Sequence, residues 1–501
     1  MKTDVFTILS SLGYKTSSEL QQYYSNINEW QAWWKGYVED FHRYSISDQN
    51  MQHIQLKRKK MGMAKKVCED WANLLLNDKT FIELEDNDGT AQTFLSGNKE
   101  EQNGGVLGAS KFWKMGNRLI EREFAMGTAC MYLDLVQPQT IDGILHAQSV
   151  RVRYINNAKM IVPLSHDNGD ITELALFSEH MKDGQEFMYV QIFQELEDGY
   201  YQVHNHYFVD SKDGAKKVEN LYGEVDSYIM PCKPFVVLMP NIDNNIADVP
   251  MGVSIYANAI DQLKGCDLAY DNLYNDILLG KKRIFMNQAM FMVQSAYRKN
   301  ADGTEERVLQ PNIKGTIEST LYVSTGTKLP DEQQIIQEYN PALRVDENKE
   351  NIQLNLNILA SKVGFGQNKY VFGGAGNDMA TATEVRASQK DLTESVWKQR
   401  IAVQEALTEL TRSILIVGKE ICGLNIDPTI KITIKFDDTM FSDEEAERMR
   451  FLQEISAGVR QRWEYRKKYD GESEEKAREM TGENENVNIS NAFFRDDITV
   501  A

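Results

Sequence analysis

The first residues whose types could do catalytic chemistry are His204 and His206, in the run His204-Asn205-His206. Their surroundings alternate, so His204, His206 and Phe208 are predicted to lie on one face of a strand. Two histidines at this spacing could share a metal ion. One class of nucleases also uses two histidines and an asparagine, but in that class the three residues are spread over a ββα unit instead of being consecutive. No acidic or thiol partner stands at ligand spacing, so a nuclease is kept only as an alternative function.

Other chemical signatures are absent from the sequence. There is no GxxxxGK[ST], HExxH or GxSxG motif. Gly373 to Gly376 precedes a predicted helix N-terminus, where free backbone N–H groups can bind an anion. Without a P-loop lysine this is weak evidence for a nucleotide. The sequence therefore favours a structural or assembly role over an enzyme, with no metal and no cofactor.

Two charged patches have a regular spacing. The run Lys57-Arg58-Lys59-Lys60 could touch phosphate, but such runs are more often a solvated helix face. A predicted helix from about Ser254 to Leu279 has a polar face with Lys264, Asp267, Asp271 and Asn275. Like charges four residues apart weaken an isolated helix, so a group outside the helix is expected to compensate for Asp267 and Asp271.

A series of helices must position these residues. The predicted helix from about Ser254 to Leu279 also has an apolar stripe, formed by Ile255, Ala259, Leu263, Cys266, Tyr270, Leu273 and Ile277. A second, over 345–363, repeats Ile352, Leu356, Leu359 and Val363. After a glycine-bearing loop over 364–380, Thr381-Ala382-Thr383-Glu384 forms a predicted capping box.

The helix that follows this box is very long and is predicted to end at Gly423. It carries a strict apolar repeat of Val396, Val403, Leu407, Leu410, Ile414, Val417 and Ile421. About forty helical residues extend roughly 60 Å, which is more than a globular domain ordinarily needs. This length favours a role in an assembly.

The rest of the chain completes an α+β pattern. Residues 1–80 are predicted to be helical, with Trp30, Trp33 and Trp34 in a core or contact surface. A helix is expected over 110–124, antiparallel strands over 128–240 and a strand over 430–436. The tail from Phe441 is predicted to be helical and charged, with a loose end.

Composition narrows the function further. The 501 residues include 74 acidic and 55 basic side chains, for a net charge of −19. A protein that coats nucleic acid is usually basic, so tight phosphate binding over a broad surface is not expected. The five cysteines are odd in number and form no CxxC motif, which predicts a reduced intracellular compartment. We expect no signal peptide and no membrane span.

Three stretches, in this order, resemble portal proteins of tailed bacteriophages, of the SPP1-like kind found in phages of Gram-positive bacteria. They are Met61–Val67 with Leu74-Leu75, Pro250–Tyr256 continuing through Asp267 to Lys281–Ile284, and Thr381–Val385 at the start of the long helix. The order of elements matches over nearly the whole chain, and the part after Phe441 matches least.

The resemblance implies a portal fold assembled as a ring, typically dodecameric, at one capsid vertex. The wing would comprise 1–253 and 381–440, the stem helices 254–280 and 345–363, the clip 281–344, the tunnel loop 364–380 and the crown 441–501. Implied partners are double-stranded DNA, the terminase large subunit, the head-completion adaptor, and the major capsid and scaffolding proteins. The protein would be made in the host cytoplasm and reside in the virion.

The resemblance also assigns roles to residues. Lys264, Asp267, Asp271 and Asn275 would face the channel, where acidic side chains let DNA slide. The loop residues expected to meet DNA are Gly364, Gly366, Lys369, Tyr370, Phe372, Gly373, Gly374 and Gly376. Tyr370, Val371 and Phe372 could instead hold the loop in place by packing between subunits. The alternative functions are another virion or scaffold-like structural protein, or a nuclease.

Overall fold

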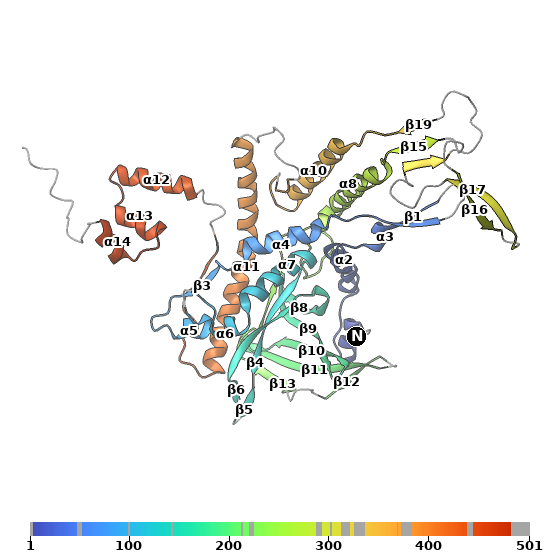
Figure 1. The fold of residues 1–501 in the computed structure, drawn as a ribbon. Coiled ribbons are helices and arrows are strands. Elements are labelled where there is room, and N and C mark those ends of the chain that lie inside the picture. Colours follow the sequence, from blue (N-terminus) through green and yellow to red (C-terminus); the bar gives the residue numbers. More distant parts are fainter. Residues whose placement is uncertain are drawn as a thin grey trace, which may run out of the picture. The chain divides into compact units, whose positions relative to one another are not determined.

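The computed structural model describes residues 4–47, 53–98, 101–141, 144–211, 214–219, 225–286, 293–300, 303–311, 321–324, 336–367, 369–371, 382–437 and 444–481. The chain divides into two compact units, Met1–Phe436 and Asp437–Ala501. Helices and sheets mix throughout the first unit (Figure 1), so the α+β expectation is confirmed.

The N-terminal segment is helical except for one hairpin. Its elements are α1 (Val5–Ser11), α2 (Ser18–Lys35), α3 (Glu39–His42), β1 (Arg43–Ser47), β2 (His53–Lys57) and α4 (Met63–Leu75). The Ser17 hydroxyl caps α2 by accepting from the Leu20 N–H at 3.1 Å. Trp30 and Trp33 are buried, as a core role predicts. The expectation of helix throughout this segment is wrong at β1 and β2, where apolar residues alternate with a period of two.

Antiparallel strands form the middle of the first unit. A six-stranded sheet has the order β12-β11-β10-β9-β8, with β13 also pairing with β11, and a three-stranded sheet has the order β14-β4-β7. The bounds are β4 (Ala129–Val136), β7 (Ser149–Ile155), β8 (Ile161–Asp167), β9 (Asp170–Lys182), β10 (Gln185–Glu195), β11 (Tyr201–Ser211), β12 (Gly214–Val218), β13 (Ser227–Met230) and β14 (Phe235–Leu238). The expected β region is confirmed.

Short elements flank these sheets. They are β3 (Phe81–Leu84), α5 (Thr90–Ser96), α6 (Gly105–Ala109), α7 (Phe112–Met126), β5 (Gln139–Ile141) and β6 (Ile144–His146). Helix α7 packs against α4, α2 and β4. The helix expected over 110–124 is therefore confirmed within two residues.

Helices α8 (Ile260–Leu279) and α10 (Val345–Lys362) pack against each other. Helix α8 begins six residues later than predicted, after a 3₁₀ turn at Ala257–Ala259. The preceding segment is fixed to the N-terminal helices, because the Tyr256 hydroxyl donates to the Trp30 carbonyl and the Ile255 N–H donates to the Phe124 carbonyl. Between the helices lie β15 (Arg283–Met286), β16 (Val293–Lys299), β17 (Glu305–Pro311), β18 (Tyr322–Ser324) and β19 (Ile336–Tyr339).

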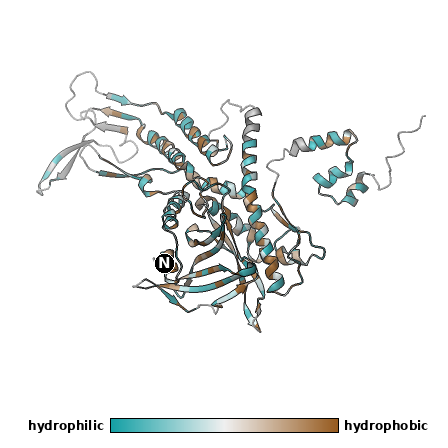
Figure 2. Cartoon of the chain, turned by 180° about the vertical axis from the view of Figure 1, so that it is seen from behind, coloured by the Kyte–Doolittle hydropathy of each residue, from teal (hydrophilic) through white to brown (hydrophobic). Residues whose placement is uncertain are grey.

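Helix α11 (Ala382–Glu420) spans 39 residues. All seven residues of its predicted apolar repeat are buried, against β14, β20 (Ile432–Lys435), α4 and α5. Figure 2 shows hydrophobic residues gathered on this part of α11 and along the neighbouring strands. Gly423 has φ +69° just beyond the helix, as a glycine stop predicts. The predicted cap at Thr381 lies outside the described residues.

The second unit contains α12 (Glu444–Ser456), α13 (Arg462–Tyr469) and α14 (Glu474–Thr481). Phe451 contacts Tyr465 and Tyr469 edge-on, at ring distances of 6.0 and 5.6 Å. The helical prediction for this tail is confirmed for these residues. No helix among the described residues is long and apolar enough to cross a membrane.

Candidate functional site

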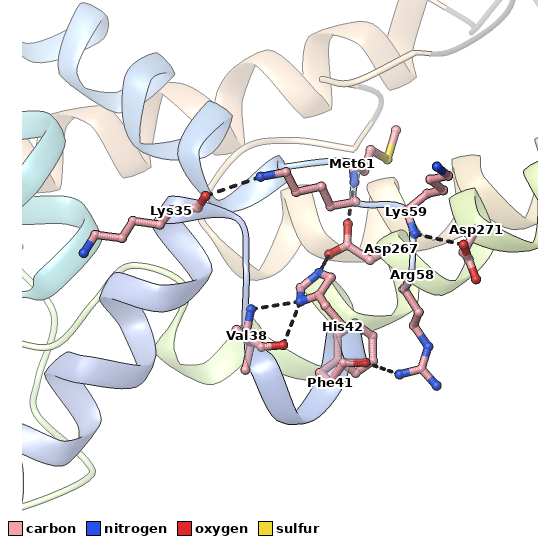
Figure 3. Close-up of polar contacts among 10 residues, drawn as sticks. Lys35, Val38, Phe41, His42, Arg58, Lys59, Met61, Asp267 and Asp271 are labelled. Atoms are coloured by element: carbon pink, nitrogen blue, oxygen red, sulfur yellow. Dashed lines mark hydrogen bonds and ion pairs between the residues drawn. The ribbon is translucent and has the colours of Figure 1, made fainter. Parts of the chain in front are cut away.

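The two carboxylates of α8 lie against the segment that follows β2 (Figure 3). One Asp267 oxygen accepts the Met61 backbone N–H at 2.6 Å, and the other lies 3.0 Å from His42 Nε2. One turn later, Asp271 accepts the Lys59 backbone N–H at 2.8 Å and the Asn275 amide at 3.1 Å. Backbone donors therefore bind both carboxylates from outside the helix.

His42 connects this cluster to α3. Its ring is buried, and the Val38 N–H lies 2.9 Å from Nδ1. Because a carboxylate only accepts, Nε2 carries the proton that is donated to Asp267. The Nδ1 atom also lies 3.1 Å from the Val38 carbonyl oxygen, so both ring nitrogens have a partner. This arrangement fixes the turn before β1 to the middle of α8.

The expectation that Asp267 and Asp271 form an open acidic stripe is wrong. Their exposed fractions are 5% and 6%, because the 59–61 segment covers them. The expected outside compensation for their like charges is confirmed by the donors at His42, Lys59 and Met61. Lys264 stays partly exposed and pairs with Asp261 at 3.3 Å, whereas Asn275 is half-buried beside Asp271.

The basic run beside this cluster is not a free helix face. The Arg58 guanidinium lies 4.5 Å from the ring centroid of Tyr44 and 4.7 Å from that of Phe41, and it donates to the Phe41 carbonyl. Lys59 Nζ lies 5.7 Å from the Tyr274 ring of α8. Cation–π contacts of this kind hold the end of the hairpin near α3 and α8.

The first part of the expected tunnel loop is packed against α4 and α10. Phe365 is buried and stacks on Trp71 of α4 at 4.8 Å. The Tyr370 hydroxyl donates to Asp70 at 3.0 Å, and Gln353 of α10 donates to the Tyr370 carbonyl at 2.8 Å. Burial and the Asp70 carboxylate raise the Tyr370 pKa. Phe365 and Tyr370 are therefore held against α4 and α10, and the predicted contact of Gly364, Gly366 and Tyr370 with DNA stays a prediction.

Lys369 differs from its neighbours because its side chain is exposed, with Nζ 5.4 Å from the Phe365 ring centroid. Gly364 has φ +84° and lies against Trp71 and Ser395, so it serves as a tight stop for α10. Phe372, Gly373, Gly374 and Gly376 lie outside the described residues.

His204 and His206 share one face of β11, as the alternation predicts, with ring centroids 6.3 Å apart. His204 Nε2 lies 3.1 Å from the Gln194 amide oxygen of β10. Burial and the nearby Lys217 lower the His206 pKa to about 4. The described part of the chain contains no group of three or more His, Cys, Asp or Glu residues that could hold a metal ion.

A cavity of about 960 Å³ lies between β14 and α11. The Glu123 side chain of α7 lines it and is 1% exposed. Burial raises the Glu123 pKa to about 8, and no donor among the described residues reaches its Oε2 atom. Lys233 and Arg412 line the same cavity.

The α8–α10 pair exposes many large apolar side chains. They are Leu268, Tyr274, Ile277, Leu278, Leu279, Leu354 and Ile358, with exposed fractions from 39% to 67%. Periodicity predicts burial for Ile277, and the described chain leaves it 50% exposed. The missed signal is that both helices carry apolar residues outside their main stripes, as a surface that meets a partner does.

Comparison with known proteins assigns the family. The family model described as "Phage portal protein, SPP1 Gp6-like" matches residues 14–489. No curated protein matches the sequence. A chain from a structure titled "Neck of native GTA particle computed with C12 symmetry" is similar, with 11% identity and a TM-score of 0.34, over 80% of this chain and 88% of that one. A likeness this low says nothing about the fold or function of this chain. Because the family model spans nearly the whole chain, this protein belongs to the SPP1 Gp6-like family of phage portal proteins.

Proposed function

We propose that twelve copies of the chain form a ring at one capsid vertex, and that viral double-stranded DNA enters and leaves through its channel. Membership of the portal family supports a virion component and a homo-oligomeric ring. The observation that carries the proposal is the exposed apolar surface of α8 and α10. A monomer would leave this surface in water, whereas a ring of helices would bury it.

Each part of the chain takes one role in this ring. Helices α8 and α10 form the stem, and residues 281–344, with β15–β19, form the clip that meets the terminase large subunit and later the head-completion adaptor. The wing, 1–253 with 381–440, faces the major capsid and scaffolding proteins, and 441–501 forms the crown. Of the polar face of α8, Lys264 remains our candidate for the channel wall.

The DNA-contacting part of the loop begins at Lys369. Phe365 and Tyr370 hold the start of the loop on α4 and α10, so contact with DNA is assigned to Lys369 and to the stretch after Tyr370. With a net charge of −19, the assembly would bind DNA weakly, without sequence preference and in a salt-dependent way.

Imaging of the purified full chain tests the ring. We expect rings with a central channel and a mass of about twelve subunits under assembly conditions. A stable monomer both in solution and in the virion would overturn the proposal. Closed shells or filaments without a channel would instead favour another structural role.

Packaging assays test the loop. Gly373→Ala with Gly374→Ala restricts positive φ, and we expect normal rings and capsids with impaired packaging or DNA retention. Lys369→Ala should weaken DNA contact in the same direction, whereas Lys390→Ala, an exposed lysine on α11, serves as the control. If both loop variants formed normal rings and packaged DNA as well as the wild type, the proposed contact of this loop with DNA would be contradicted.

A further inference from the structure

The β1–β2 hairpin has one apolar face, whose base is partly covered and whose outer end is exposed in the described chain. Tyr44 pairs with Leu56, and Ile46 pairs with Ile54. Tyr44 and Leu56 are half-buried, but Ile46 and Ile54 are 46% and 43% exposed. The other face carries only polar side chains, all exposed: Arg43, Ser45, Ser47, His53, Gln55 and Lys57.

The hairpin has no further sheet to stabilise it. No third strand among the described residues pairs with β1 or β2, and a two-stranded hairpin is only marginally stable in water. Its base is nevertheless firmly held, because His42 and Lys59, which flank the strands, both bind α8 carboxylates. The hairpin is therefore fixed at its base and exposes apolar side chains at its other end, as expected of an extension that binds another protein chain.

A matching surface lies on α10. Its buried face carries Ile352, Leu356 and Leu359, while Leu354 and Ile358 are 59% and 41% exposed. Leu354 and Ile358 are four residues apart, so they lie side by side on the helix. Glu347 and Glu350 are also exposed on this helix, on the side away from the buried stripe at about 100° per residue.

The two surfaces lie on opposite sides of α8. The hairpin base contacts α8 at Asp267 and Asp271. Helix α10 approaches at Gly265, where an added Cβ would lie 2.3 Å from Asn355 Oδ1, and at Asp276, which accepts from Asn348 at 2.7 Å. At about 100° per residue, the two sets of positions are roughly 120–180° apart around the helix. A head-to-tail ring needs two different patches facing in opposite directions.

We propose that the β1–β2 hairpin of each subunit docks on α10 of the next copy of this chain, with Ile46 and Ile54 packed on Leu354 and Ile358. The charges agree, because the exposed Lys57, Lys59 and Lys60 near the hairpin base would face the acidic start of α10. Salt should therefore weaken the contact. The inference rests on the proposed ring and names one of the contacts that close it.

Cysteine cross-linking in assembled full-length protein tests the contact. Ile54→Cys and Ile358→Cys subunits are prepared separately, mixed, assembled and oxidised. A head-to-tail contact predicts cross-linked dimers that stop at two subunits, while a chain carrying both substitutions yields a ladder up to the closed ring. Neither single variant should cross-link alone. The wild type controls for the native cysteines, four of which are buried, and Met181→Cys, 70% exposed on β9, replaces Ile54→Cys as the matched control.

The outcomes separate this inference from the ring itself. Normal rings without the Ile54→Cys to Ile358→Cys cross-link, or with cross-links between two Ile54→Cys hairpins, overturn the docking contact and leave the ring standing. A wild type that forms no ring overturns both. Amide hydrogen exchange of the wild type gives a readout without substitutions: exchange in 43–47 and 53–57 should slow severalfold on assembly, and unchanged exchange in intact rings would also overturn the contact.

Discussion

Helix α11 and the α8–α10 pair are both amphipathic, but they bury their apolar residues to different extents. The repeat of α11 is buried within one chain, from Val396 to Ile421. The α8–α10 pair buries Leu263, Cys266, Leu356 and Leu359, yet it leaves seven large apolar side chains exposed. The region around α11 therefore buries its apolar residues within one chain, whereas the α8–α10 pair leaves a large apolar surface exposed, which the proposed ring would cover.

The two regions also differ in the hydrogen-bond partners of their buried carboxyl groups. Beside α11, Glu123 is buried without a partner for Oε2 among the described residues. On α8, Asp267 and Asp271 are just as buried but receive backbone and histidine donors. The polar partners of α8 thus come from the N-terminal segment, and we expect the position of α8 to depend on that segment.

Matched leucine substitutions should give the largest contrast. Leu407→Ala in α11 removes a side chain that is 1% exposed and should lower the free energy of unfolding by about 2–5 kcal/mol. Leu354→Ala in α10 is 59% exposed and should change it by at most about 0.5 kcal/mol, while reducing ring formation. Urea unfolding at low protein concentration and sedimentation measure the two effects. An equally large loss of monomer stability in both variants would erase the distinction.

Removing the buried carboxylates of α8 should cause the next largest loss of stability. Asp267→Ala leaves the buried His42 ring and the Met61 N–H without their acceptor, and we expect a loss of about 3 kcal/mol. Asp271→Ala affects Lys59 and the less buried Asn275, so about 1–2 kcal/mol is expected. Urea midpoints compare the two variants. If both were as mild as Lys264→Ala on the exposed part of α8, the N-terminal segment would not hold α8 in place.

Glu123, in the cavity between β14 and α11, gives stability a dependence on pH. Its folded-state pKa of about 8 lies above its unfolded value, so the folded state holds the proton more tightly. Stability is therefore greatest below the unfolded pKa and decreases as the pH rises from about 4.5 to about 8. Glu123→Gln should remove this slope and raise stability at pH 8 by about 4 kcal/mol. Urea midpoints at pH 5 and 8 test it, with the exposed Glu405→Gln as control. Parallel slopes in wild type and Glu123→Gln would contradict the assignment.

The smallest effect concerns Gly364, where the end of α10 meets Trp71 of α4. Gly364→Ala adds a Cβ at φ +84° within 3.2 Å of Trp71, and it should cost about 1 kcal/mol. Gly423→Ala has the same sign of φ but open space around the Cβ, so it should cost less. Calorimetric unfolding of both variants isolates the Trp71 contact. Equal costs would mean that backbone strain alone matters at Gly364.

Local periodicity predicted the regular elements well. The α11 repeat, the α10 stripe and the antiparallel strands were all readable because an apolar period reports which face of an element is buried. The order of motifs also predicted the portal family, which the family match confirms. The hairpin was readable in principle, since Tyr44, Ile46, Ile54 and Leu56 alternate, but it lies between two helices.

By itself, the sequence determined the family, the α+β class, the long helix and the need for a compensating group beside Asp267 and Asp271. Only the tertiary structure decided that His42, Lys59 and Met61 supply it, and that Phe365 and Tyr370 are anchored rather than free. The physical reason is distance along the chain: these partners lie some two hundred to three hundred residues away. Periodicity shows that a face is polar, but the segment that folds over it decides whether the face meets water, a neighbour or DNA.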